Sequence, residues 1–222
     1  MRLPSPVSRI VRQTPLDRWI LDWAESRAQR QALEAWLARD KAGAPPHRIK
    51  QQVVAAYAKA FGLRTLIETG TYTGAMPWAL RDAFDRIVTI ELDEALWRRA
   101  RNRFGRMPQV RCELGNSADV LPRVLGEIHA PCLFWLDGHY SGKGTAHGPL
   151  ASPLVRELEL ILDHPSEGHV ILIDDARHLT GRDGYPTLED LEALFRVRRP
   201  TWTCVVRNDI VRAHPPLDAS LP

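Results

Sequence analysis

The chain has 222 residues, of which 44% are hydrophobic and 26% are charged, an ordinary balance for a globular protein with a sizeable core. The length suits one α/β domain with a short appendage, and a net charge of +3 with arginines scattered along the chain does not indicate nucleic-acid binding. The sequence has neither an apolar signal core at its start nor a run of roughly 20 apolar residues, so we expect a cytoplasmic protein without a membrane partner.

Residues 1–47 are expected to form a helical extension ahead of the main domain. Apolar side chains recur at helical spacing between Pro15 and Ala42, and the segment GAPPH, Gly43–His47, interrupts them. Helical spacing resumes over residues 48–61, and Gly62 is well placed to end that helix. The extension could cover a ligand site or form a homodimer, and the sequence does not choose between these uses.

The remainder of the chain, residues 48–222, alternates short β-rich runs with helical segments. The runs are TLIETG, RIVTIEL, VRCELG, CLFWLDG and HVILIDD. Apolar strands that alternate with helices predict a parallel sheet covered on both faces. The last segment, TWTCVVRNDIVRAHP, predicts two antiparallel strands joined at Arg207 and Asn208. We therefore predict a doubly wound, Rossmann-like α/β domain with a mostly parallel seven-stranded sheet and a C-terminal antiparallel hairpin.

The loop after the first predicted strand indicates the kind of ligand. The stretch TLIETGTYTGAMPWAL has Gly70 and Gly74 but neither the G-x-G-x-x-G of a dinucleotide fold nor a Walker Gly-Lys-Ser/Thr. Glu68 would repel a phosphate but suits a cation, and the glycines would let the backbone approach a ligand closely. Glu91 ends the second strand about 20 residues after Gly70, the spacing of an acid that takes ribose hydroxyls. These features favour S-adenosylmethionine, which has an amino group, a sulfonium charge and no phosphate.

Several segments together resemble the class I S-adenosylmethionine-dependent methyltransferases. They are KQQVVAAYAKAFGLRTLIETGTYTGAMPWAL, IVTIEL, ELGNSADVL and FWLDGHYSGKGTA. Within that class the chain is similar to small bacterial enzymes with an E-T-G-T-Y-x-G first loop, over about Lys50 to His214. One departure is that relatives often have an acid after the second glycine, where this chain has Ala75 and Pro77. Proline suits the first turn of a helix, so the departure leaves the expectation of cofactor binding in place.

The resemblance implies a role for each segment in holding the cofactor. The methionine part would be held by Glu68, Gly70, Thr71, Tyr72 and Gly74. The remaining contacts would come from Glu91 to the ribose, from Asn116, Ser117 and Ala118 to the adenine, and from Asp137 to the amino group.

Acids at the ends of the fourth and fifth predicted strands indicate a second function for this edge of the sheet. Asp137, Asp174 and Asp175 should lie near one another there, and three carboxylates repel one another unless a cation or protons compensate them. Oxygen ligands of this kind suit Mg²⁺. The alternative, which stays open, is that Asp137 contacts the cofactor while Asp174 and Asp175 cap helices or pair with Arg177.

The acid arrangement also resembles metal-dependent O-methyltransferases that act on catechols or sugars. In that role a metal would orient a substrate hydroxyl and lower its pKa. His139, two residues beyond Asp137, is the candidate that accepts the substrate proton, because histidine titrates near neutral pH. The expected catalytic residues are therefore His139 and Asp137.

The leading hypothesis is O-methylation of a small hydroxylated molecule such as a sugar, a catechol-like compound or a natural product. One alternative is a metal-independent methyltransferase with a nitrogen or carboxylate acceptor. Another is a non-catalytic protein that binds the cofactor, since a fold by itself does not establish a function. RNA methylation is disfavoured, because no Asn-Pro-Pro-Tyr-like stretch follows the fourth strand.

Overall fold

The computed structural model describes residues 27–28, 30–40, 43–138, 152–182 and 184–217. The chain forms two compact units, residues 1–48 and 49–222. In the first unit residues 30–38 are helical, and the buried indole of Trp36 donates a hydrogen bond to the carbonyl of Gly43 at 3.3 Å.

The second unit is built on one sheet of seven strands. Its strands are β1 (Thr65–Thr69), β2 (Arg86–Glu91), β3 (Val110–Leu114), β4 (Leu133–Leu136), β5 (Val170–Ile173), β6 (Thr203–Arg207) and β7 (Ile210–His214). Their order across the sheet is β3-β2-β1-β4-β5-β7-β6. The first five are parallel, and β7 runs antiparallel to both β5 and β6. This confirms the predicted fold class, including the terminal hairpin.

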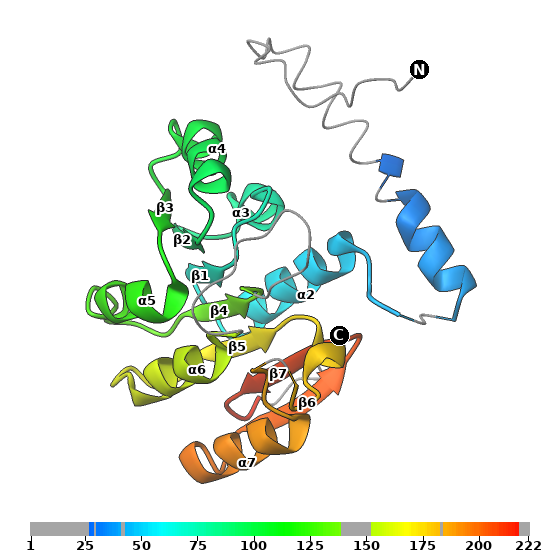
Figure 1. The fold of residues 1–222 in the computed structure, drawn as a ribbon, viewed down its shortest axis with the longest axis vertical. Coiled ribbons are helices and arrows are strands. Elements are labelled where there is room, and N and C mark those ends of the chain that lie inside the picture. Colours follow the sequence, from blue (N-terminus) through cyan, green and yellow to red (C-terminus); the bar gives the residue numbers. More distant parts are fainter. Residues whose placement is uncertain (1–26, 29, 41–42, 139–151, 183, 218–222) are drawn as a thin grey trace. The chain divides into compact units, whose positions relative to one another are not determined.

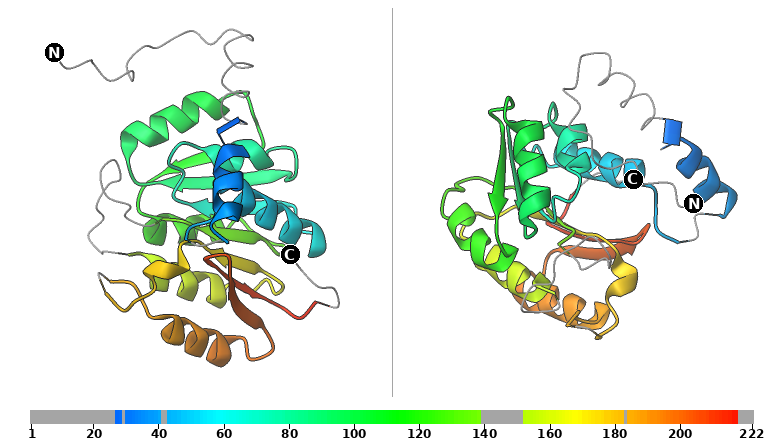
Figure 2. Two further views of the ribbon diagram at one scale, coloured as in Figure 1. Left: turned by 90° about the vertical axis from the view of Figure 1, so that its right-hand side faces the viewer. Right: turned by 45° about the horizontal axis from the view of Figure 1, so that its top comes forward.

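Helices cover both faces of this sheet, as Figure 1 and Figure 2 show. The helices are α2 (His47–Ala60), α3 (Ala75–Leu80), α4 (Glu94–Phe104), α5 (Ser117–Leu125), α6 (Leu154–Asp163), η1 (Ala176–His178) and α7 (Leu188–Arg198). One apolar core joins α2, α3 and α4 to the sheet, and a second joins α5, α6 and α7 to the opposite face. Strands β4 and β5 are buried along their whole length, as expected of central strands in a parallel sheet. Among the described helices, none has the length and apolar character needed to cross a bilayer.

The hairpin turn differs by one residue from the sequence prediction. Arg207 still pairs with Ile210 and is the last residue of β6, so the turn consists of Asn208 and Asp209. Both have left-handed backbone angles, with φ of 53° and 60°. Two left-handed residues suit the right-handed twist of the flanking strands, and Asn and Asp tolerate them better than most residues.

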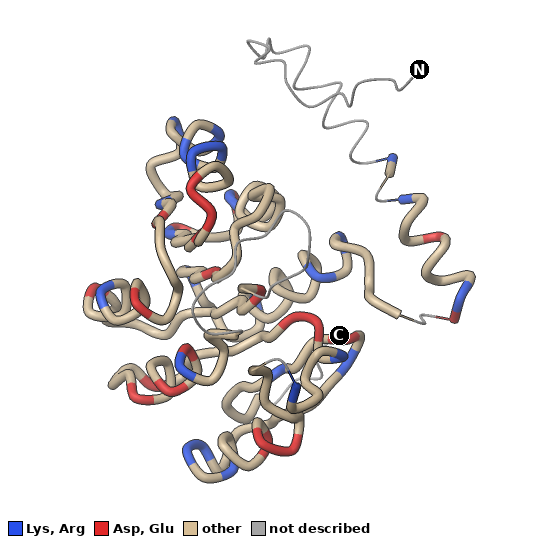
Figure 3. The backbone as a smooth tube through the Cα atoms, in the orientation of Figure 1, with Lys and Arg blue, Asp and Glu red and all other residues tan. Residues whose placement is uncertain are grey.

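The basic residues are less evenly spread than the sequence suggests. Helix α4 carries four arginines among its 11 residues, and Lys and Arg gather there in Figure 3. Arg98 pairs with Glu94 on the same helix, and the guanidinium of Arg101 lies 5.0 Å from the ring centre of Trp97. Such contacts are typical of a solvated helix surface.

A pair of histidines, the buried His169 and the half-buried His164, lies at the opposite end of β5 from the acids. The backbone N–H of Cys132 donates to Nδ1 of His169 at 3.0 Å, so a neutral His169 carries its proton on Nε2. That nitrogen lies 3.0 Å from Nδ1 of His164, whose Nε2 in turn lies 3.1 Å from the carbonyl of Leu125. Each ring therefore has a matched donor and acceptor only when both are neutral. Burial, with smaller contributions from His164 and Arg199, lowers the pKa of His169 to about 4.

We expect the side chain of His169 to lower the free energy of unfolding as the pH drops from about 6.5 to about 4, in addition to the contributions of the other groups that titrate. In that window the unfolded chain protonates His169 while the folded chain does not, so acid favours unfolding by about 3 kcal/mol. Urea unfolding at pH 7.5 and pH 4 would measure this. Relative to the unmodified protein, His169→Gln should be more stable at pH 4 by about 3 kcal/mol once its stability at pH 7.5 is subtracted, whereas the same substitution at the exposed His129 should leave the pH dependence unchanged. An equal pH dependence in both variants would show that the histidine pair is not its source.

Candidate functional site

The candidate site lies at the carboxyl ends of β1, β2, β4 and β5, where a parallel α/β sheet commonly binds ligands. The loop after β1 begins at Gly70, which has a φ of 88°. A Cβ at this position would lie 2.4 Å from the carbonyl oxygen of Asp137. A glycine is therefore required here because the loop passes close to the protein's own backbone at the end of β4. Gly70 brings the ends of β1 and β4 together.

Gly74 and Pro77 start the helix that follows this loop. Gly74 is the N-cap of α3 with a φ of 72°, and a Cβ there would lie 2.8 Å from the ring of Phe104 on α4. Pro77 is buried in the first turn of α3, where backbone N–H groups have no partner within the helix. Local conformation and packing thus account for both residues.

Glu91 connects the first loop to the second. At the end of β2, its Oε2 accepts a hydrogen bond from the backbone of Tyr72 at 2.7 Å, and its Oε1 accepts one from Asp93 at 2.9 Å. Tyr72 is in the left-handed region with a φ of 47°, and its side chain is exposed. Each carboxylate oxygen has a second lone pair, so Glu91 can still accept hydrogen bonds from a ligand.

Glu68 is buried next to β2. The hydroxyl of Thr89 donates to its Oε2 at 2.5 Å, and the hydroxyls of Thr71 and Thr89 lie 2.5 Å apart. Burial raises the pKa of Glu68 well above its usual value, and the nearby Asp137 and Glu91 raise it further, although the hydrogen bond from Thr89 opposes the change. A cation beside this carboxylate would favour its charged form.

Residues 116–118, predicted to contact adenine, begin α5 after β3. Asn116 is the N-cap, and its side-chain oxygen accepts a hydrogen bond from the backbone of Ala118 at 2.9 Å. Ser117 is buried next to Glu157 of α6, an acid that sequence reasoning missed. Burial raises the pKa of Glu157 to about 7, and the nearby hydroxyls of Ser117 and Thr69 oppose the change. A single acid on the apolar face of an amphipathic helix was the signal for it.

The three acids of the predicted metal site do come together. One carboxylate oxygen from each of Asp137, Asp174 and Asp175 lies within 4.8 Å of the others. Burial raises the pKa of Asp174 to about 6. Burial and the charge of Asp174 raise the pKa of Asp137 well above its usual value. Both shifts express the cost of placing like charges in a poorly solvated position.

Lys50 joins this cluster and is the second residue that sequence reasoning missed. It lies in the first turn of α2, and its Nζ contacts Oδ2 of Asp174 and lies 3.2 Å from Oδ1 of Asp175. The side chain of Asp174 is completely buried, while that of Lys50 is 12% exposed. Because the two residues are 124 positions apart, no local pattern indicates the pair.

Arg177 ties the cluster to the hairpin. Its guanidinium lies 2.9 Å from Oδ1 of Asp175 and also contacts the carboxylate of Asp209 in the turn. Burial opposes ionisation of Asp175, but Lys50 and Arg177 outweigh it and lower the pKa of this carboxyl. The pairing of Asp175 with Arg177, one of the expected alternatives to metal binding, is therefore present.

His139, the proposed proton acceptor, lies outside the described residues. Its role stays a prediction.

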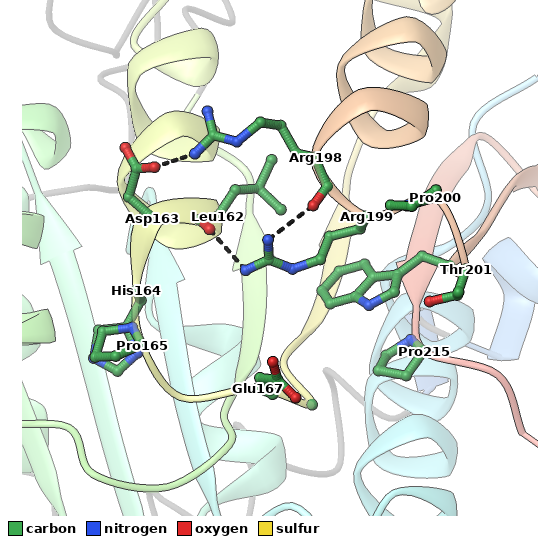
Figure 4. A pocket seen from close by; sticks show the side chains of 12 residues that line it. Leu162, Asp163, His164, Pro165, Glu167, Arg198, Arg199, Pro200, Thr201 and Pro215 are labelled. Carbon is green, nitrogen blue, oxygen red and sulfur yellow. Dashed lines mark hydrogen bonds and ion pairs between the residues drawn. The ribbon is translucent and has the colours of Figure 1, made fainter.

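A cavity of about 850 Å³ lies away from these acids, near the amino-terminal end of β5 (Figure 4). It is formed where α6 and α7 end. Arg199 donates to the carbonyls of Leu162 and Arg198, and Arg198 pairs with Asp163. These arginines neutralise the helix ends. The cavity contains none of the residues predicted to bind cofactor or metal.

Comparison with known proteins identifies the fold. A scan against protein-family models finds no match, and a search of curated proteins finds none either. Solved structures do match. One is the O-methyltransferase TomG from Streptomyces achromogenes, involved in tomaymycin synthesis and solved in complex with SAM. It is 17% identical, with 92% of this chain and 100% of that chain covered and a TM-score of 0.56.

Two further structures match over similar lengths. An O-methyltransferase from Bacillus cereus in complex with SAH is 16% identical, covering 90% of this chain and 97% of that chain with a TM-score of 0.57. An SAH-bound methyltransferase from Podospora anserina is 18% identical, covering 95% and 100% with a TM-score of 0.53. At these identities the likeness establishes a shared Rossmann-like methyltransferase fold.

We expect Gly70→Ala to lower the free energy of unfolding by about 2–4 kcal/mol, because the new Cβ meets the Asp137 carbonyl and the backbone is left-handed. Gly62→Ala is the matched control. Gly62 also has a positive φ, of 64°, but a Cβ there has open space, so the loss should be about 1 kcal/mol. Urea unfolding of both variants measures the difference. Equal losses would mean that the approach to β4 does not constrain Gly70.

Proposed function

We propose that the protein is an S-adenosylmethionine-dependent methyltransferase that acts on a hydroxyl group of a small molecule. The observation that carries the proposal is the arrangement of acids around the Gly70 loop. Glu68, Glu91 and Asp137 lie at or next to the carboxyl ends of three adjacent strands, and the pKa values of Glu68 and Asp137 are raised well above their usual range. Such an edge is suited to a cationic ligand and unsuited to a phosphate.

The matched structures support the choice of ligand. Proteins that share the fold over nearly the whole chain were solved with SAM or SAH. In this chain we assign the amino group of the methionine part to Glu68 and Asp137, and the ribose to Glu91. Thr71, Tyr72 and the glycines would shape the loop around the ligand. Adenine would lie near Asn116, Ser117 and Ala118 at the start of α5.

The acceptor would bind beside Asp137, Asp174 and Asp175. When bound, S-adenosylmethionine supplies a methyl group made electrophilic by its sulfonium. The chain must hold the acceptor oxygen in line with that methyl group and take its proton, and His139 is our candidate for the proton acceptor. Two of the matched proteins are O-methyltransferases, which supports an oxygen acceptor.

A divalent ion fits the chemistry of the three acids. Their oxygens lie within 4.8 Å of one another and are the hard ligands that Mg²⁺ prefers. When bound by Asp137, Asp174 and Asp175, the ion would polarise the acceptor oxygen and favour its deprotonation. Magnesium therefore remains part of the proposal as an occupant of the three carboxylates whenever they are free to bind it.

The proposal predicts that S-adenosylhomocysteine binds and that Glu91→Ala weakens the binding by about 1.5–3 kcal/mol, because two ribose hydroxyls lose a charged acceptor. Isothermal titration calorimetry gives both values. Glu94→Ala, which removes an exposed acid from the neighbouring first turn of α4, should bind like the unmodified protein. If Glu91→Ala also bound normally, Glu91 would not belong to the site. Absence of binding by the unmodified protein would refute the proposed function.

A further inference from the structure

The cluster of Asp137, Asp174 and Asp175 already holds a cation that belongs to the chain. The ammonium of Lys50 contacts Asp174 and lies 3.2 Å from Asp175. An ammonium has three N–H donors, and among the described residues these two carboxylates take two of them. Asp137 also acts electrostatically on Lys50.

The position of Lys50 is set by its helix. Val53, Val54 and Tyr57 of α2 are buried in the core formed with the sheet, which holds the first turn of α2 at the carboxyl edge. The side chain of Lys50 is 12% exposed, unlike that of the exposed Lys59 in the last turn. Burying an ammonium is costly unless it is paired, so Lys50 and the acids stabilise one another.

The space among the acids suits one cation. The three ligand oxygens lie within 4.8 Å of one another. Lys50 donates hydrogen bonds to two of the three acids, Asp174 and Asp175. A divalent ion would use the same carboxylates, and two cations at this separation would repel strongly in a poorly solvated site. An ion can therefore enter only if the ammonium leaves.

We infer that Lys50 is the resident cation of this cluster and that it and a divalent ion are mutually exclusive occupants. Lys50 then sets the metal affinity of the site. With the ammonium in place, its third N–H can donate to an acceptor oxygen and stabilise developing negative charge, a role that a metal would otherwise have. This part of the inference rests on the proposed function, because it treats the cluster as the acceptor site.

The test measures Mn²⁺ binding by isothermal titration calorimetry in the unmodified protein, Lys50→Met and Lys50→Arg. We expect the dissociation constant for Mn²⁺ to be at least tenfold lower in Lys50→Met than in the unmodified protein. Mn²⁺ should also raise the melting temperature of that variant more than that of the unmodified protein. Lys50→Arg retains a positive charge and should bind the ion as weakly as the unmodified protein. Lys59→Met, which removes an exposed lysine from the same helix, should change nothing.

Two further variants make the outcome specific. Adding Asp175→Asn to Lys50→Met should abolish the gain, which places the ion at this cluster. Lys50→Gln, polar and uncharged, replaces Lys50→Met if the apolar side chain prevents folding, and circular dichroism establishes which variants fold. Mn²⁺ binding by the uncharged variants that is no tighter than in the unmodified protein would overturn the inference. So would an equal gain in Lys59→Met.

Binding of S-adenosylhomocysteine, measured on the same samples, separates this inference from the proposed function. If that ligand fails to bind while Lys50→Met gains Mn²⁺ affinity, the proposed function is wrong and the exclusion stands. If the ligand binds and the metal affinities are all equal, the exclusion is wrong and the proposed function stands.

Discussion

Like-charge repulsion at one edge of the sheet is the constraint on which the site depends. A parallel sheet places the carboxyl ends of its strands together, so acids that end separate strands become neighbours. In this chain they are Glu68, Glu91, Asp137, Asp174 and Asp175. Burial makes their repulsion stronger than it would be in water. Each acid therefore needs compensation from the protein, a ligand or a proton.

The compensation that the protein itself supplies differs from one acid to the next. Glu91 accepts two backbone N–H groups, and Asp175 has Lys50 and Arg177 beside it. Glu68 has a threonine hydroxyl, while the pKa of Asp137 is raised despite the partial help of Lys50. The pKa values of Glu68 and Asp137, which flank Gly70, are both raised well above their usual range. A cationic ligand at this loop would relieve both at once.

Features encoded by local patterns could be predicted from the sequence. Apolar runs such as CLFWLDG and HVILIDD predict buried strands. The same runs place the acids at the carboxyl ends of these strands. Once the sheet is parallel, the meeting of Asp137 with Asp174 and Asp175 is a geometric consequence. The hairpin was also predictable, although its turn was shifted by one residue because Arg207 continues the ladder.

Features that depend on packing between distant segments could not be predicted. Lys50 reaches Asp174 because the buried face of α2 fixes the helix against the sheet. No sequence pattern around Lys50 indicates that Asp174 is its partner. The sequence also could not show why residue 70 must be a glycine. A glycine in a loop suggests room for a ligand, whereas this one is required by the carbonyl of Asp137. The sequence therefore predicted that the three aspartates lie together, and it missed the lysine that pairs with them.

The charge of the acid cluster is controlled from outside the loop that would hold the cofactor. Lys50 comes from the helix before β1, and Arg177 is held by Asp209 in the turn between β6 and β7. Asp175 itself is left-handed, with a φ of 54°, an arrangement that costs energy for a residue other than glycine. Its contacts with Lys50 and Arg177 offset that cost. A substitution in α2 or the hairpin can thus alter the charge of the acid cluster while the Gly70 loop stays unchanged.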